Sequence, residues 1–171
     1  MDIPDTVTTI GNYAFRKCTG LMSVKFGTSV SASNLVTIGE SSFYGCTGLT
    51  TVTIPNKVTT IGAYAFKGCT GLATLNLGKN VTTLGDSAFH SCVKLTQILF
   101  KDKVASLGDY CFSGCTGLNL LGFEGNAPTF QPYTFKNVKA TAAYYRNKRG
   151  WLNVILNSYG GNITWVSAGI G

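Results

Sequence analysis

Short runs of alternating apolar and polar residues recur along this chain, and one stretch shows the pattern most clearly. Residues 49–54 (LTTVTI) alternate with a period of two, which predicts a short strand. The sequence Pro-Asn-Lys at 55–57 predicts a turn, and residues 58–61 (VTTI) predict a second short strand. In residues 61–69 the apolar positions Ile61, Ala65 and Cys69 are four residues apart, which predicts one or two helical turns after Gly62.

This unit is repeated along the chain. The sequence FKGCTGL at 66–72 returns as FYGCTGL at 43–49 and FSGCTGL at 112–118, with looser copies at 15–21 and 89–95. A fixed step in this range is typical of solenoids, in which each unit buries its apolar face against its neighbours. We therefore predict an α/β repeat solenoid of parallel strands and short helical turns. The step between the repeated phenylalanines is 28 residues once and then 23 four times, from Phe15, Phe43, Phe66, Phe89, Phe112 and Phe135.

The first, longer step contains five extra residues, near 31–35, which we expect to bulge at one edge of the stack. After Ala127-Pro128 the repeat decays. We divide the chain into five repeats of about 23 residues at 1–126 and a degenerate sixth repeat with a C-terminal cap at 127–171, together one continuous domain. In the cap we expect a strand at 141–145, helical spacing of Trp151, Ile155 and Tyr159, and a final strand at 163–166.

The strand pattern also separates inward from outward positions. The first, middle and last apolar residues of each strand form core columns, so the two residues that flank the middle one face outward. Adjacent outward leucines are either an exposed contact patch or lie under the cap, and the pattern leaves both open for Leu99 and Leu120. Ser23 and Gly122 share these positions, and the candidate ligand-binding surface is Lys25, Thr51, Thr53, Thr74, Asn76, Gln97, Leu99 and Leu120.

The repeat resembles the BspA-like leucine-rich repeats of bacterial and protist surface proteins. The matching residues are 49–55 (LTTVTIP), 58–62 (VTTIG) and 65–69 (AFKGC), and the tail at 142–166 looks like the segment that often closes such arrays. The resemblance implies a right-handed leucine-rich repeat stack with a parallel, concave β-sheet. It also implies a noncatalytic module of a secreted or surface-displayed protein, with an adhesion role toward a protein or glycan on a host or bacterial surface. The alternative is a structural spacer that stiffens a larger surface protein.

The chain is basic, with 14 Lys and Arg against 7 Asp and Glu, which permits anionic partners without selecting one. The turns after the strands contain four lysines that we expect along one rim: Lys57, Lys79, Lys101 and Lys103. They are either ordinary solvated side chains or a cationic ridge that binds anionic glycans or acidic partners. Nucleic-acid binding is not expected, because the repeat aromatics belong to the core. No apolar run approaches the roughly 20 residues of a membrane span. No signal peptide precedes the first repeat, so we expect a fragment whose signal and anchor lie elsewhere.

Residues for catalysis do not converge in the pattern, so we predict no enzyme, no cofactor and no metal site. The single histidine, His90, occupies a position that other repeats fill with Arg16, Tyr44, Lys67 or Ser113, which indicates a solvated side chain. Five of the six cysteines recur in register with the repeat: Cys18, Cys46, Cys69, Cys92 and Cys115. This recurrence favours a ladder of small, buried, free thiols, and Cys111 lies outside the register. The residues after the repeat glycine are expected to cap the helical turns: Asn12, Glu40, Asp86 and Asp109.

Overall fold

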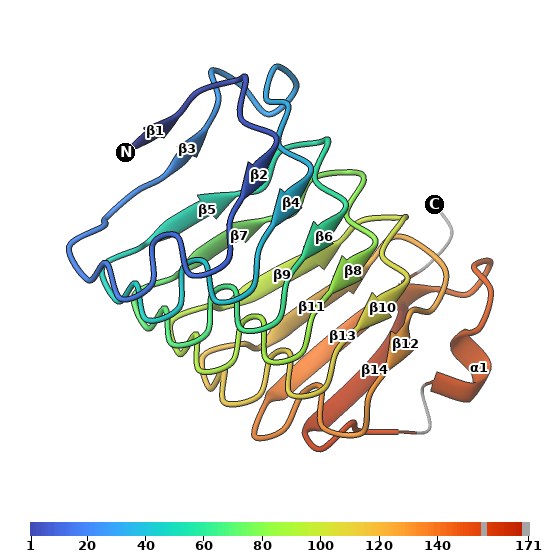
Figure 1. Cartoon of the computed structure of the whole chain (residues 1–171). Coiled ribbons are helices and arrows are strands. Elements are labelled where there is room, and N and C mark those ends of the chain that lie inside the picture. Colours follow the sequence, from blue (N-terminus) through green and yellow to red (C-terminus); the bar gives the residue numbers. More distant parts are fainter. Residues whose placement is uncertain (155–156, 169–171) are drawn as a thin grey trace.

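The chain winds into a stack of parallel β-coils, as the computed structural model shows for the residues that it describes, 1–154 and 157–168 (Figure 1). Each of the first six coils contributes one strand to each of two rows, and the C-terminal cap adds two more strands to one of the rows. The long-strand row consists of β1 (Asp2–Ile3), β3 (Lys25–Phe26), β5 (Thr51–Thr53), β7 (Thr74–Asn76), β9 (Gln97–Phe100), β11 (Leu120–Phe123), β13 (Lys139–Tyr145) and β14 (Asn162–Ala168). The short-strand row consists of β2 (Thr9–Ile10), β4 (Thr37–Ile38), β6 (Thr60–Ile61), β8 (Thr83–Leu84), β10 (Ser106–Leu107) and β12 (Thr129–Phe130).

The pairing register follows the sequence period. The short strands pair in the order β12-β10-β8-β6-β4-β2, all parallel, with Thr60 opposite Thr83 and Thr9 opposite Thr37. In the long-strand row, β9, β11, β13 and β14 form one parallel sheet, and β5 pairs with β7. A bridge between Ser23 and Thr51 joins the first coils to this row. The predicted parallel solenoid is therefore confirmed.

The repeated phenylalanines form the centre of the core. Phe43, Phe66, Phe89, Phe112 and Phe135 are fully buried, and their rings stack from coil to coil with centroids 5.1 to 6.0 Å apart. Offset parallel rings at this distance contribute about 0.5–1.5 kcal/mol per pair beyond the burial of their apolar area. The apolar strand positions, such as Leu49, Val52 and Ile54, close the core on the long-strand side.

The predicted helical turns after the repeat glycine are wrong, and so is the α/β class, because the repeats contain no helix among the described residues. Residues 63–69 form consecutive turns instead, with positive φ at Tyr64 (57°) and Gly68 (72°). Alternate N–H groups bond within the turn and to the next coil: Lys67 N donates to Tyr64 O at 3.1 Å, while Phe66 N donates to Ala88 O at 2.7 Å. The run therefore forms a third ladder of hydrogen bonds between coils, which we call the turn face.

The expected helix caps serve that ladder. Asn12 Oδ1 accepts from Glu40 N at 2.9 Å, and Asp86 Oδ1 accepts from Asp109 N at 2.8 Å. Asp109 Oδ1 accepts from Tyr133 N at 3.2 Å. Each of these side chains thus satisfies a backbone donor of the following coil, and Asp109 Oδ1 also accepts from Tyr110 N in its own segment at 3.1 Å. Glu40 instead accepts a hydrogen bond from the Tyr13 hydroxyl at 3.2 Å.

The C-terminal cap continues the long-strand row and closes the core with aromatic rings. It contains the four-residue helix α1 (Trp151–Val154) between β13 and β14; Ile155, part of the predicted helical spacing, lies outside the described residues. Trp151 is buried, contacts the rings of Phe123 and Tyr144 with centroids 5.0 and 5.1 Å away, and donates to Gly125 O at 3.1 Å. At the other end, the extra residues of the first step form an exposed loop at 28–32, and Leu35 turns back into the core.

Candidate functional site

The outward side chains of the long strands form two parallel columns, which we call the long-strand face. One column runs through Thr51, Thr74, Gln97, Leu120, Thr141 and Thr164. The other runs through Lys25, Thr53, Asn76, Leu99, Gly122, Ala143 and Val166. The second column is polar in its early coils and apolar from Leu99 onward, whereas the first column is polar except at Leu120.

A hollow of about 480 Å³ lies in the later part of this face. It brings together five of the predicted surface residues, Thr74, Asn76, Gln97, Leu99 and Leu120, and leaves Lys25, Thr51 and Thr53 on earlier coils. Leu99 and Leu120 are 44% and 43% exposed, so the described part of the cap does not cover them.

Two small residues that the sequence analysis did not single out as binding residues also line the hollow. Gly122 and Ala143 contribute to its lining, and a Cβ atom at Gly122 would lie 2.7 Å from Cδ1 of Leu99. Because Gly122 has no side chain, the end of the Leu99 side chain can lie over it. Alternation along residues 139–145 (KATAAYY) is the signal that could have placed Ala143 on this face, once the pairing of β13 with β11 is known.

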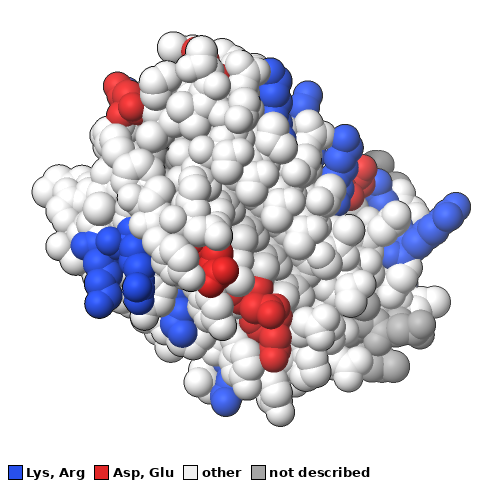
Figure 2. Space-filling model, in the orientation of Figure 1, with Lys and Arg blue, Asp and Glu red and all other residues white. Residues whose placement is uncertain are grey.

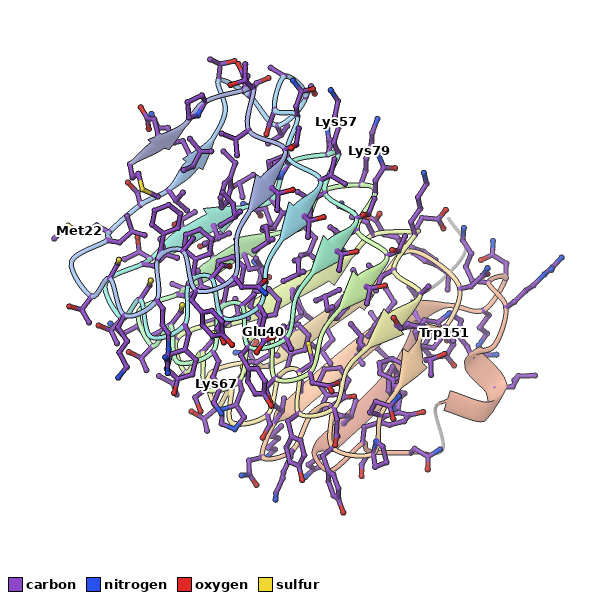
Figure 3. All side chains as sticks on the ribbon, viewed as in Figure 1. Met22, Glu40, Lys57, Lys67, Lys79 and Trp151 are labelled. Atoms are coloured by element: carbon purple, nitrogen blue, oxygen red, sulfur yellow. The ribbon has the colours of Figure 1, made fainter. Side chains whose placement is uncertain are left out.

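The rim is the second candidate surface, formed by the turns that follow β5, β7, β9, β11 and β13. The four predicted rim lysines all lie on it, in three neighbouring columns: Lys57 and Lys103 share one, and Lys79 and Lys101 occupy the other two. Lys101 pairs with Glu124 at 3.1 Å, and Lys148 from the cap pairs with Asp102 at 3.1 Å. In Figure 3, Lys57 and Lys79 project side by side from the same edge of the stack.

The turn face carries exposed aromatic rings that the sequence analysis did not consider for binding. Tyr13, Tyr64 and Tyr133 are exposed, and cations lie over such rings: Lys67 Nζ is 5.3 Å from the centre of Tyr64, and Arg16 is 5.8 Å from that of Tyr13. Each exposed cation–π pair contributes about 0.5–1 kcal/mol. Acidic and basic side chains, among them Glu40 and Lys67, lie near one another on this face (Figures 2 and 3). The mixed charge favours no single class of ligand.

The cysteines take up a structural position. All six cysteines are free, and five of them are buried. The predicted burial of Cys18 is wrong: this residue is exposed because it lies in the first coil, at the end of the column. The buried thiols donate to carbonyl groups of the preceding coil, with Cys69 Sγ 3.2 Å from Phe43 O and Cys46 Sγ 3.0 Å from Phe15 O. Burial raises the pKa of Cys69 to about 12 and that of Cys46 to about 11, so both remain protonated donors at neutral pH.

His90 is half-buried, and its Nδ1 lies 2.8 Å from Ser91 Oγ. Burial, and then the positive charge of Lys67, lower the pKa of His90, so the ring is neutral at neutral pH. Within residues 1–154 and 157–168, no three His, Cys, Asp or Glu side chains gather as a metal site would require. Nor does that part of the chain contain a helix of the length and apolarity needed to cross a membrane.

Comparison with known proteins agrees with the fold. A profile of the BspA type leucine-rich repeat region matches six copies over residues 1–35 and 36–148. The crystal structure of a T. pallidum leucine-rich repeat protein is similar over 71% of this chain and 56% of that one, with 27% identity and a TM-score of 0.62. A leucine-rich cell surface protein from Faecalibacterium prausnitzii is similar over 72% of this chain and 38% of that one, with 30% identity and a TM-score of 0.56.

The chain therefore spans about half or less of the length of these similar proteins. No curated protein sequence matches it. The profile covers most of the chain. The chain belongs to the BspA-type leucine-rich repeat family.

Proposed function

We propose that this chain is a noncatalytic interaction module of a secreted or surface-displayed protein and that it binds a protein ligand through the long-strand face. The observation that carries the proposal is the hollow around Leu99 and Leu120. Membership in a family of repeat proteins typical of interaction modules supports it, as does the similarity to a cell surface protein of F. prausnitzii.

The hollow has the composition of a protein-binding surface. Leu99, Leu120 and Ala143 supply an apolar centre, and the hydroxyl and amide groups of Thr74, Asn76 and Gln97 surround it. Protein interfaces combine an apolar core, depleted in charge, with a polar rim that remains accessible to water. A leucine side chain that is nearly half exposed on a strand face gains free energy when a ligand covers it, at about 25 cal/mol for each Å² of apolar surface removed from water.

The test uses a panel of purified extracellular-matrix glycoproteins immobilised for surface plasmon resonance. The variant carries Leu99→Asp and Leu120→Asp. Met22→Asp is the control, since Met22 is 73% exposed, does not line the hollow and lies just before β3, toward the N-terminal end of the stack (Figure 3). We expect saturable binding by the wild-type chain and the control, and a loss of about tenfold or more in affinity in the variant, because a central apolar contact is replaced by two charges. Equal binding by all three proteins, or no saturable binding by the wild-type chain, would contradict the proposal.

The uniform stack supports a second candidate, a spacer that stiffens a larger surface protein. The phenylalanine column is continuous from Phe15 to Phe135, and rods of this kind resist bending because each coil packs on the next. The two functions are distinguished in the parent protein. A spacer tolerates Leu99→Asp and Leu120→Asp without loss of adhesion by the parent protein, and an interaction module does not.

A further inference from the structure

The rim carries most of the excess positive charge of the chain. The turns after β5, β7, β9, β11 and β13 contain seven cations and two carboxylates, so five of the net seven positive charges lie there: Lys57, Lys79, Lys101, Lys103, Arg146, Lys148 and Arg149 against Asp102 and Glu124. Figure 2 shows basic side chains following one another along this edge of the stack. Asp5, in the turn after β1, lies beyond these turns, and its carboxylate accepts hydrogen bonds from Thr28.

One column of the rim alternates amides and cations. Residues at a spacing of 23 are Lys57, Asn80, Lys103, Asn126 and Arg149, with Asn34 on the preceding coil. The Nζ atom of Lys57 donates to Asn34 Oδ1 at 2.6 Å, and that of Lys103 donates to Asn80 Oδ1 at 2.7 Å. These hydrogen bonds hold the lysines in place and leave their charge uncompensated, because the acceptor is a neutral amide. Successive cations of the column are two coils apart, about 10 Å.

The column ends at a hollow in the cap. The hollow has a volume of about 720 Å³ and is lined by Arg146, Lys148, Arg149, Tyr144 and Trp151, among others. Asn126 Oδ1 accepts from the backbone N of Arg149 at 2.9 Å, which fixes the loop where the column reaches the hollow. Cations spaced along an edge and then gathered around a hollow provide both a track and an end site for a long anionic ligand.

We propose that the rim binds a linear acidic polysaccharide in which charged sugars alternate with neutral ones, and that the polysaccharide lies across the coils with one end in the cap hollow. A sugar unit is about as long as one coil spacing, so each cation of the column meets an acidic group and each amide meets the hydroxyl groups of the neutral sugar between. This site is separate from the long-strand face.

The chemistry of the rim favours a polysaccharide over a nucleic acid. Nucleic acids carry a charge on every nucleotide, and proteins that bind single strands interleave cations with aromatic rings on which the bases stack. On the rim, amides separate the cations, and the rings of Tyr144 and Trp151 are buried against each other.

Fluorescence anisotropy with labelled hyaluronan oligosaccharides, in which each uronate alternates with a neutral N-acetylhexosamine, tests the proposal. Neutral dextran oligosaccharides, oligo-dT and poly-glutamate of matched charge are the other probes. The rim variant carries Lys57→Gln, Lys103→Gln and Arg149→Gln. The control carries Lys17→Gln, Lys94→Gln and Lys136→Gln, three exposed residues away from the rim, so both variants lose the same charge. We expect the rim variant to lose about tenfold or more in affinity for hyaluronan and the control to lose less than about twofold.

The other probes complete the test. Binding of oligo-dT or poly-glutamate as tight as that of hyaluronan would overturn the assignment to a polysaccharide. Equal losses in the two variants would show that only net charge matters, and the absence of saturable binding by the wild-type chain would overturn the site itself. All six positions are exposed, and matching circular dichroism spectra confirm that the variants are folded.

Discussion

The column of phenylalanine rings predicts how stability depends on the position of a residue along the stack. Phe89 is fully buried and stacks on Phe66 and Phe112, each at 5.3 Å, whereas Phe15 is partly exposed and stacks on Phe43 alone at 5.2 Å. Replacing a buried phenylalanine by alanine removes its contacts and leaves a cavity, at about 3–5 kcal/mol. We therefore expect Phe89→Ala to lower the free energy of unfolding by about 3–5 kcal/mol and Phe15→Ala by about 1–2 kcal/mol, since less apolar area is lost.

Urea unfolding followed by far-UV circular dichroism measures both values, provided that the m-value stays constant. Phe89→Leu separates ring stacking from volume: it keeps most of the volume and should cost about 1–3 kcal/mol, the value of the two lost ring pairs. If Phe15→Ala and Phe89→Ala cost the same, or if Phe89→Ala costs less than about 1 kcal/mol, then stability does not come from rings packed coil on coil, and the reasoning is refuted.

Four further predictions concern the coil contacts and the buried thiols. Ser42→Ala should raise the free energy of unfolding, measured in urea, by about 1 kcal/mol. The buried Ser42 hydroxyl has no hydrogen-bond partner among the described residues, and alanine occupies the equivalent position in the neighbouring coils. A loss of stability would contradict this prediction. Gly85→Ala should lower the midpoint of thermal unfolding, because its Cβ would lie 2.6 Å from Ala63 N, and an unchanged midpoint would show that the coils can separate there. Titration with Ellman's reagent should find one reactive thiol, Cys18, in the native protein and six after denaturation. Because an unfolded thiol ionises near about pH 8.5 and burial holds the pKa of Cys46 at about 11, the unfolded state loses its proton first, so stability should fall as the pH rises through this window.

The sequence period predicts the stack well because every coil repeats the same register. Once Phe66 and Phe89 occupy equivalent positions, the strands, the core columns and the outward columns follow from one unit. Residues 61–69 are the exception, because their four-residue spacing predicts a helix that does not form. The spacing of Ile61, Ala65 and Cys69 fits a helix, but positive φ at Tyr64 redirects alternate N–H groups to the next coil, and a tyrosine gives no sequence signal for that conformation.

The candidate surfaces were only partly predictable. Alternation placed Leu99 and Leu120 outward, but the hollow between them also depends on Gly122 and on Ala143 from the cap, where the repeat no longer sets the register. The rim lysines were expected to stack in line, yet a step of 23 from Lys57 reaches Asn80, so lysines and amides alternate. Ion pairs such as that between Lys101 and Glu124 depend on side-chain positions that no repeat pattern contains.

The most direct test of the long-strand face is to fill the hollow without disturbing the fold. Gly122→Val adds a side chain whose Cβ contacts only the flexible end of Leu99, at 2.7 Å, and the backbone O of Ile98, at 4.0 Å; valine also suits a strand. The measurement is the dissociation constant of Gly122→Val and of the wild-type chain for the matrix glycoproteins of the panel, together with the midpoint of thermal unfolding. We predict an unchanged or higher midpoint and a loss of about tenfold or more in affinity. An unchanged dissociation constant in a stably folded Gly122→Val variant would contradict the claim that this face is the interaction site.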